Sequence, residues 1–124
     1  MPFDSNALVR QPKPVAADST LADRPIRCSV CRTPVTSARQ RTQRGGGFDH
    51  RLVNPAGIRF HVGCFNAAPG CRAPGEATYQ HSWFPGYAWK IAVCGGCGAQ
   101  LGWSYDGAGD AFFGLILDRL RETE

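Results

Sequence analysis

Four of the six cysteines stand in two Cys-x-x-Cys pairs, Cys28 with Cys31 and Cys94 with Cys97. Two such pairs supply four thiolates, which is the ligand set of a closed tetrahedral structural zinc site. The 62 residues between the pairs far exceed the about 15–20 that separate the pairs of a compact zinc ribbon. The sequence therefore predicts a structural Zn²⁺ that joins two hairpins distant in the chain, with two disulfides as the less favoured alternative.

The two other cysteines, Cys64 and Cys71, have no partner in a motif. Buried thiols or a loop disulfide are the favoured interpretations, and a catalytic or redox thiol is the alternative. A reactive cysteine needs a basic neighbourhood that lowers its pKa. The sequence around both cysteines specifies no such neighbourhood, although His61 lies close to Cys64 in the chain.

The second chemical feature is aromatic, because all three tryptophans fall within residues 79–105. A Pro85-Gly86 turn between Trp83 and Trp89 would let their indoles face a common space. Trp103 and Tyr105 are two residues apart, so on a strand they share one face. Such aromatic residues pack a core or line a cage, and the residues alone leave both interpretations open.

Length and composition limit the architecture that must position these residues. A chain of 124 residues with 43% hydrophobic content suits one domain. The 9 prolines and 15 glycines favour turns and short strands over long helices. The sequence contains no apolar run of membrane-spanning length, and its first residues lack the order of a signal peptide. We therefore predict a cytoplasmic protein without a membrane partner, in which paired cysteines indicate metal.

Proline and glycine positions divide the chain into short elements. Residues 1–24 read as a flexible N-terminal arm, and residues 25–124 as a single zinc-bound domain. Alternating or apolar runs predict strands, whereas residues 66–78 read as a loop and residues 34–44 as an exposed, edge-like strand. Residues 111–120 suit a strand or a short helix, and the alternation there favours a strand. The other expected strands are 26–31, 48–53, 58–62, 87–93 and 101–105.

Charge is unevenly distributed along the chain. Residues 1–47 carry eight Lys and Arg against three acids, whereas residues 48–124 carry six against seven. A basic half can favour nucleic acid. However, Arg39, Arg41 and Arg44 alternate with Gln and Thr, without aromatic residues that would stack on bases. A solvated strand face is the favoured interpretation, so nucleic acid is not an expected partner.

The string HSWFPGYAW at residues 81–89, followed by Cys94-x-x-Cys97 and Gly102-Trp103, closely resembles the thalidomide-binding domain of cereblon, also called the CULT domain. The resemblance runs from about Cys28 to Leu117. It implies an all-β fold of two small antiparallel sheets, arranged as a β-tent and pinned by a structural zinc. The size of the chain adds the expectation of a stand-alone bacterial member of this family.

The resemblance also implies a ligand class, cyclic imides such as glutarimide, and a place for each ligand-binding residue. Trp83, Trp89 and Trp103 would form the walls and Tyr105 the base, where animal cereblons have Phe. His81 and Trp83 would hydrogen-bond the imide, and Asn54 and Pro55 would form the rim. Phe60 and Gln80 stand where the animal protein has a histidine and a glutamate. The predicted set is Asn54, Pro55, Phe60, Gln80, His81, Ser82, Trp83, Trp89, Trp103 and Tyr105.

The leading functional hypothesis is therefore a non-enzymatic module that binds cyclic imides, either small molecules or protein C-termini on which Asn or Gln has cyclised. No ubiquitin ligase assembly is expected. One alternative is a reader of methyl-lysine or another quaternary ammonium, although residues 79–105 contain no Asp or Glu to favour a cation. A less favoured alternative is a thiol enzyme that resembles methionine sulfoxide reductase B and uses Cys64 or Cys71.

Overall fold

The computed structural model describes residues 23–122. The predicted N-terminal arm therefore lies outside the described residues, apart from its last two. None of the helices in the described part of the chain has the length and apolar character that a membrane crossing requires.

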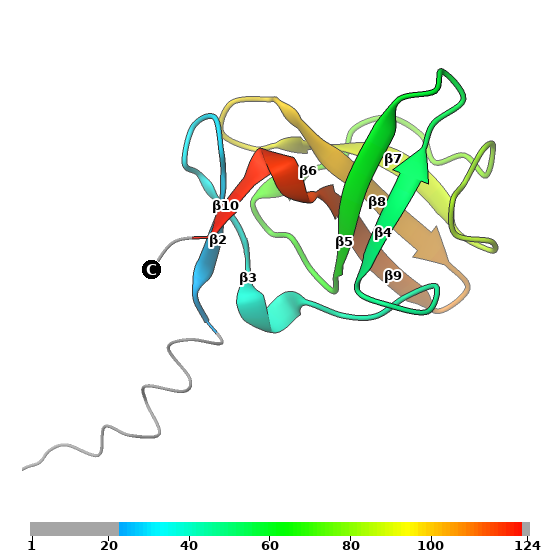
Figure 1. Ribbon diagram of the computed structural model, residues 1–124, viewed down its shortest axis with the longest axis horizontal. Coiled ribbons are helices and arrows are strands. Elements are labelled where there is room, and N and C mark those ends of the chain that lie inside the picture. The colour runs from blue at the N-terminus through cyan, green and yellow to red at the C-terminus, as the bar shows by residue number, and fades with distance from the viewer. Residues whose placement is uncertain (1–22, 123–124) are drawn as a thin grey trace, which may run out of the picture.

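Two antiparallel sheets make up the fold (Figure 1). The smaller sheet has the order β10-β2-β3, from Leu120–Glu122, Pro25–Cys28 and Pro34–Ser37. The larger sheet has the order β4-β5-β9-β8-β7-β6. Its strands are Asp49–Val53, Arg59–Phe65, Asp110–Ile116, Gln100–Gly107, Ala88–Cys94 and Cys71–Arg72. The prediction of an all-β fold with two antiparallel sheets is confirmed.

The structure contradicts the prediction for one segment and resolves the open alternative for another. The predicted exposed strand at 34–44 is wrong, since β3 ends at Ser37 and a 3₁₀ helix, η1, follows at Ala38–Gln40. Val35 is buried in the core, and the Thr36 hydroxyl donates to the Ala67 carbonyl at 2.7 Å. Residues 111–120 follow the alternation, because β9 runs to Ile116 before the 3₁₀ helix η2 at Leu117–Arg119 leads the chain into the smaller sheet.

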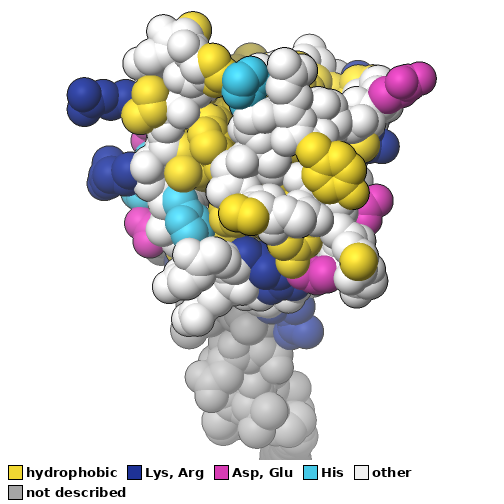
Figure 2. Space-filling model, turned by 90° about the vertical axis from the view of Figure 1, so that its right-hand side faces the viewer, with side chains coloured by type: hydrophobic (Ala, Val, Ile, Leu, Met, Phe, Trp, Pro, Cys, Tyr) yellow, Lys and Arg dark blue, Asp and Glu magenta, His cyan; other side chains and the backbone are white. Residues whose placement is uncertain are grey.

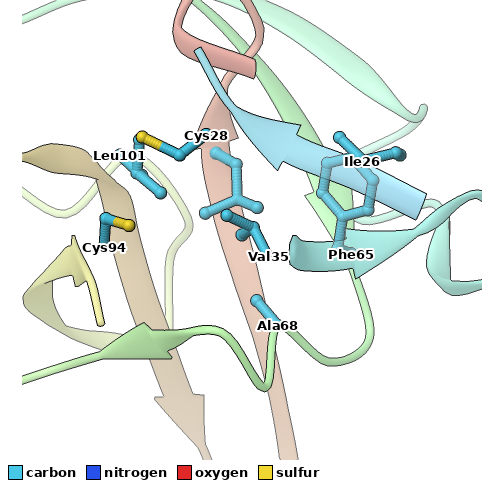
Figure 3. Packing of buried hydrophobic residues seen from close by; sticks show 8 residues of the cluster. Ile26, Cys28, Val35, Phe65, Ala68, Cys94 and Leu101 are labelled. Carbon is cyan, nitrogen blue, oxygen red and sulfur yellow. The ribbon is translucent and has the colours of Figure 1, made fainter. Parts of the chain in front are cut away.

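Each face of the larger sheet carries its own core. One face packs against the smaller sheet through a group that we call the metal-side cluster (Figure 3). Figure 3 shows Ile26 and Phe65 at one end of this group, Cys28 and Cys94 at the other, and Val35 between them. The opposite face carries the aromatic cluster, made up of Val62, Cys64, Phe84, Trp103, Tyr105, Phe112 and Ile116.

A bulge in the β7–β8 ladder places two residues of β8 that are two positions apart in different cores. Ala92 pairs with Gly102 and Val93 with Gln100, so Leu101 is the extra residue. Leu101 belongs to the metal-side cluster, whereas Trp103 belongs to the aromatic cluster. In a regular strand, residues two apart share a face. The extra residue shifts that alternation, so one strand serves both cores.

The three arginines of the basic segment form ion pairs. Arg41 and Arg44 contact Glu122 and Asp110 at 2.7 and 2.9 Å, and Arg39 contacts Asp23. The guanidinium of Arg44 makes two hydrogen bonds to Asp110 and lies over the ring of Phe112. These arginines therefore bind the 38–47 segment to the rest of the fold, and their charges are compensated by acids.

Candidate metal centre and ligand pocket

The two Cys-x-x-Cys segments form turns with the same backbone hydrogen bonds. In the first, the Cys28 amide donates to Thr33 and the Arg32 amide to the Cys28 carbonyl, both at 2.9 Å. In the second, the Cys94 amide donates to Ala99 at 2.8 Å, and the Gly98 amide donates to the Cys94 carbonyl at 2.9 Å. The residue after the second cysteine has a positive φ in both turns, 69° at Arg32 and 81° at Gly98. We call these two turns the knuckles.

The four sulfur atoms of the knuckles converge, since all lie within 4.8 Å of one another. Two of the separations are 3.8 Å between Cys28 and Cys97 and 3.6 Å between Cys31 and Cys94. Thiolates bound at about 2.3 Å in a tetrahedron would be about 3.8 Å apart. All six cysteines are free, so the alternative of two disulfides is wrong. The predicted cysteine set thus forms a site whose size and ligands fit a metal ion.

The surroundings of the sulfurs favour the thiolate form at one ligand. The Thr33 hydroxyl lies 3.0 Å from the Cys31 sulfur. This hydrogen bond is the largest cause of a pKa of Cys31 lowered to about 6, and the Thr33 backbone and the neighbouring sulfurs add to it. The backbone amide of Gly96 donates to the Cys94 sulfur at 3.3 Å. Such donors orient thiolates and compensate their charge. Cys28 and Cys94 are buried while Cys31 and Cys97 are exposed, so the site lies at the edge of the metal-side cluster.

The aromatic face of the larger sheet contains a cavity of about 330 Å³. This volume lies at the small end of the range for ligand-binding pockets. Figure 2 shows the side of the molecule where the hairpin ends of the larger sheet gather, with hydrophobic side chains across it. The cavity is lined by Asn54, Pro55, Phe60, His81, Trp83, Trp89, Ile91, Gln100, Trp103 and Tyr105.

The pocket walls hold one another by ring contacts. Trp83 packs edge-on against Trp103 with ring centroids 4.9 Å apart and planes at 86°. Phe60 packs edge-on against Trp103 at 5.2 Å and is tilted against Trp83 at 6.1 Å. Perpendicular contacts of this kind are favourable for aromatic rings. Trp83 and Trp103 are therefore held nearly perpendicular to each other, and their rings do not stack across the cavity.

The indole N–H groups of two walls are engaged by the loops at the rim. Trp83 Nε1 donates to the Val53 carbonyl at 3.0 Å, and Trp89 Nε1 donates to the Gln80 carbonyl at 2.8 Å. Each bond satisfies a polar group that would otherwise lack a partner beside an apolar space. These two walls therefore offer ring faces to the cavity, and polar contacts with a ligand must come from other groups.

A turn at residues 79–82 presents His81 to the pocket. The Ser82 amide donates to the Tyr79 carbonyl at 3.2 Å, and His81 has a φ of 60°. Since Gln80 has no positive φ, this is the pattern of a type II turn, whose third position favours Gly or Asn. A histidine there costs on the order of 1 kcal/mol of backbone strain, a feature often found at ligand sites.

Two polar backbone groups of the pocket lining are free. Within residues 23–122, neither the His81 carbonyl nor the Trp83 amide has a hydrogen-bond partner. Asn54 is more occupied, since its side-chain oxygen accepts from the Ala56 and Ile58 amides at 2.9 Å each. Only the NH₂ group of Asn54 is left to donate outward.

Most of the predicted ligand-binding residues meet at this cavity, but two do not. Gln80 and Ser82 fall outside the lining, because Gln80 contributes its carbonyl to Trp89 and the Ser82 hydroxyl donates to Phe84. Sequence reasoning missed Ile91 and Gln100. Ile91 lies two residues after Trp89 on the same strand and directly opposite Trp103, so strict alternation would have found it. The position of Gln100 in the lining depends on the bulge in β8, which no feature of the sequence predicts.

The two remaining cysteines lack the features of activated thiols. Cys64 is fully buried in the aromatic cluster, and burial raises its pKa to about 11. Cys71 is opposite Cys94 in the β6–β7 ladder, and burial also raises its pKa to about 11. A nucleophilic cysteine requires a lowered pKa. The predicted loop disulfide does not form either, since both thiols are free.

Comparison with known proteins gives the geometry a family context. No family model matches the chain. Cereblon of Gallus gallus is 37% identical over 81 residues, which cover 58% of this chain and 18% of that protein. Cereblon of Danio rerio is 36% identical over 76 residues, 57% of this chain and 18% of that protein. Cereblon of Drosophila virilis is 41% identical over 52 residues, 38% of this chain and 8% of that protein.

Over more than half of its length, this chain is similar to part of cereblon. The chain thus spans about a fifth or less of the length of the cereblons that it matches. The likeness therefore concerns the domain and does not extend to the whole relatives. A stand-alone bacterial protein stays a prediction.

Proposed function

We propose that this domain binds cyclic imides of the glutarimide type in the indole-walled pocket, without catalysis. The observation that carries the proposal is the combination of apolar indole faces with free backbone groups at one edge of the cavity. An imide presents an acceptor, a donor and an acceptor along one edge. The His81 carbonyl would accept from the imide N–H, while the Trp83 amide would donate to an imide oxygen.

The rest of the ligand would lie against the aromatic walls. The ring methylenes of glutarimide gain dispersion and apolar burial against Trp83, Trp89 and Trp103. A ligand of eight heavy atoms cannot exceed roughly −12 kcal/mol. We expect about −6 to −8 kcal/mol, which corresponds to micromolar dissociation constants. The cyclised C-terminus of a protein would present the same ring, with the peptide leaving past Asn54 and Pro55.

Tryptophan fluorescence during titration with glutarimide tests this proposal. We expect saturation in the micromolar range, because the ring contacts three indoles. Trp89→Ala should abolish saturation while the melting temperature stays close to that of the wild type, since Trp89 is only partly buried. A wild-type signal that does not saturate, or one that Trp89→Ala leaves unchanged, would overturn the proposal.

Two alternatives receive less support. A methyl-lysine reader benefits from an acidic residue beside its aromatic walls, and no Asp or Glu lines the cavity among the described residues. Trimethyllysine should therefore fail to compete with glutarimide. A thiol enzyme would need an activated cysteine, whereas Cys64 and Cys71 have raised pKa values. The absence of catalysis, of a ligase assembly and of nucleic-acid binding stays a prediction, as does cytoplasmic location.

We further propose that the four knuckle cysteines hold a structural Zn²⁺. Zinc favours four thiolates in a closed tetrahedron, and such a site leaves no open position for substrate. The ion would fix the β2–β3 turn to the β7–β8 turn, so its binding and folding would be coupled. Metal analysis of the purified protein should give one zinc per chain, and Cys28→Ser should remove it.

A further inference from the structure

Tyr105 contributes a polar group to the pocket in an otherwise aromatic setting. Its side chain is 2% exposed and lines the cavity. Its ring stacks on Phe112 with centroids 4.9 Å apart and meets Phe84 edge-on at 4.8 Å. Gly114 makes room for it, since a Cβ at that position would lie 3.0 Å from the Tyr105 ring. The ring is therefore held in one place by its neighbours.

The hydroxyl of Tyr105 has no hydrogen-bond partner in the part of the chain that the structure describes. Buried polar groups are rarely left unpaired, because each costs on the order of 1–3 kcal/mol. The other two tyrosines differ from it, since Tyr87 donates to Asp110 and Tyr79 is 68% exposed. Cys64 interacts electrostatically with Tyr105, but a thiol is a weak acceptor and no hydrogen bond joins the two side chains.

A water molecule is a poor permanent partner for this hydroxyl. A buried water needs two to four polar partners, whereas the aromatic rings packed on Tyr105, those of Phe84 and Phe112, offer none. A weakly held water is displaced at little cost by a ligand atom that replaces its hydrogen bond. The natural occupant of this position is therefore an acceptor carried by the ligand.

We propose that the Tyr105 hydroxyl selects cyclic imides whose ring carries an oxygen acceptor on the edge away from the imide. This inference rests on the proposed function, because it assumes that the imide edge binds His81 and Trp83. With that edge at the turn, the proposal places the opposite ring edge against Tyr105, which also lines the cavity. An acceptor there receives the tyrosine proton, whereas a methylene leaves the hydroxyl unpaired.

A matched pair of ligands tests the proposal. Glutarimide and morpholine-3,5-dione share the imide and ring size, and they differ only in the ring atom opposite the nitrogen, which is a methylene in one and an ether oxygen in the other. Calorimetric titration of both rings into the wild type and into Tyr105→Phe gives a ratio of affinities for each protein. We expect the wild type to prefer morpholine-3,5-dione and Tyr105→Phe to lower that preference about tenfold.

Controls separate this role from general effects. Tyr79→Phe removes a hydroxyl outside the pocket and should leave the ratio unchanged. A ratio that Tyr105→Phe leaves within about twofold of the wild type would overturn the inference while glutarimide binding still supports the proposed function. If neither ring binds the wild type, the proposed function falls and this inference falls with it.

Discussion

The metal centre and the pocket are built on opposite faces of one sheet by different means. The metal centre depends on two short turns, each of which places its sulfurs through local backbone hydrogen bonds. The pocket depends on side chains from four separate segments, three of which meet through the ring contacts of Phe60, Trp83 and Trp103. Strand β7 joins them, with Trp89 near one end and Cys94 at the other. We therefore expect a metal ion bound by the four cysteines to stabilise the fold, while the aromatic cluster shapes the pocket.

Removal of the metal should have the largest effect. Structural zinc contributes apparent binding free energies of about 10–16 kcal/mol, comparable to or above the whole stability of a small domain. Chelation, or Cys94→Ser, should therefore unfold the domain, as seen by circular dichroism. The matched variant Cys71→Ser lies opposite Cys94 but outside the sulfur cluster, and it should stay folded. A metal-free protein with an unchanged melting temperature would contradict this role of the knuckles.

Substitutions of Trp103 and Trp89 should affect stability and ligand binding to different degrees. Trp103 is 8% exposed and contacts both Trp83 and Phe60, so Trp103→Ala should lower the free energy of unfolding by about 3–5 kcal/mol. Trp89 is more exposed, and its replacement should cost clearly less stability while removing ligand binding. Urea unfolding of both variants measures the difference, and equal losses would show that the pocket walls are uniform parts of one core.

The carboxyl group of Asp110 should make the free energy of unfolding depend on pH. Hydrogen bonds from Arg44 and Tyr87 lower the pKa of Asp110 to about 2. Because the folded pKa lies below the unfolded value of about 3.9, the stabilisation is present above about pH 4 and is lost as pH falls toward 2. In urea unfolding at pH 5 and pH 3, Asp110→Asn should lose less stability than the wild type over this interval. Equal losses in the two proteins would mean that the carboxylate contributes nothing through these bonds.

The smallest effect should distinguish the two knuckles from each other. Arg32 and Gly98 occupy the same position with positive φ, where glycine is favoured. Gly98→Ala should lower the free energy of unfolding by about 1 kcal/mol. Arg32→Gly should change it by less, because relief of strain offsets the added chain entropy. Denaturant unfolding of the metal-loaded protein measures both, and a larger loss for Arg32→Gly would show that the knuckles are not equivalent.

The cysteine cluster and the aromatic cluster were predictable from the sequence, because both have local signals. Cys-x-x-Cys spacing announces a knuckle, and Trp103 and Tyr105 share a face by simple alternation. Features set by contacts between distant segments were not predictable. The bulge at Leu101, the burial of Val35 and Thr36, and the pairing of Arg44 with Asp110 each depend on a partner far away in the chain.

The predicted ligand-binding residues also divide into those with a local sequence signal and those whose role depends on contacts elsewhere in the chain. Gln80 was expected among the ligand-binding residues, yet it lies outside the cavity lining and its carbonyl accepts from the Trp89 indole. That contact arises from the turn at residues 79–82, which no residue type there favours, since His81 occupies a position usual for glycine. A residue that supports a wall and one that lines the cavity look alike in a sequence motif.

Calorimetric titration of glutarimide into the metal-loaded protein at two temperatures tests the central claim most directly. The account predicts one site per chain, a micromolar dissociation constant and a negative heat-capacity change, because ring methylenes leave water for the indole faces. Absence of saturable heat at both temperatures would contradict the claim that this pocket receives a cyclic imide.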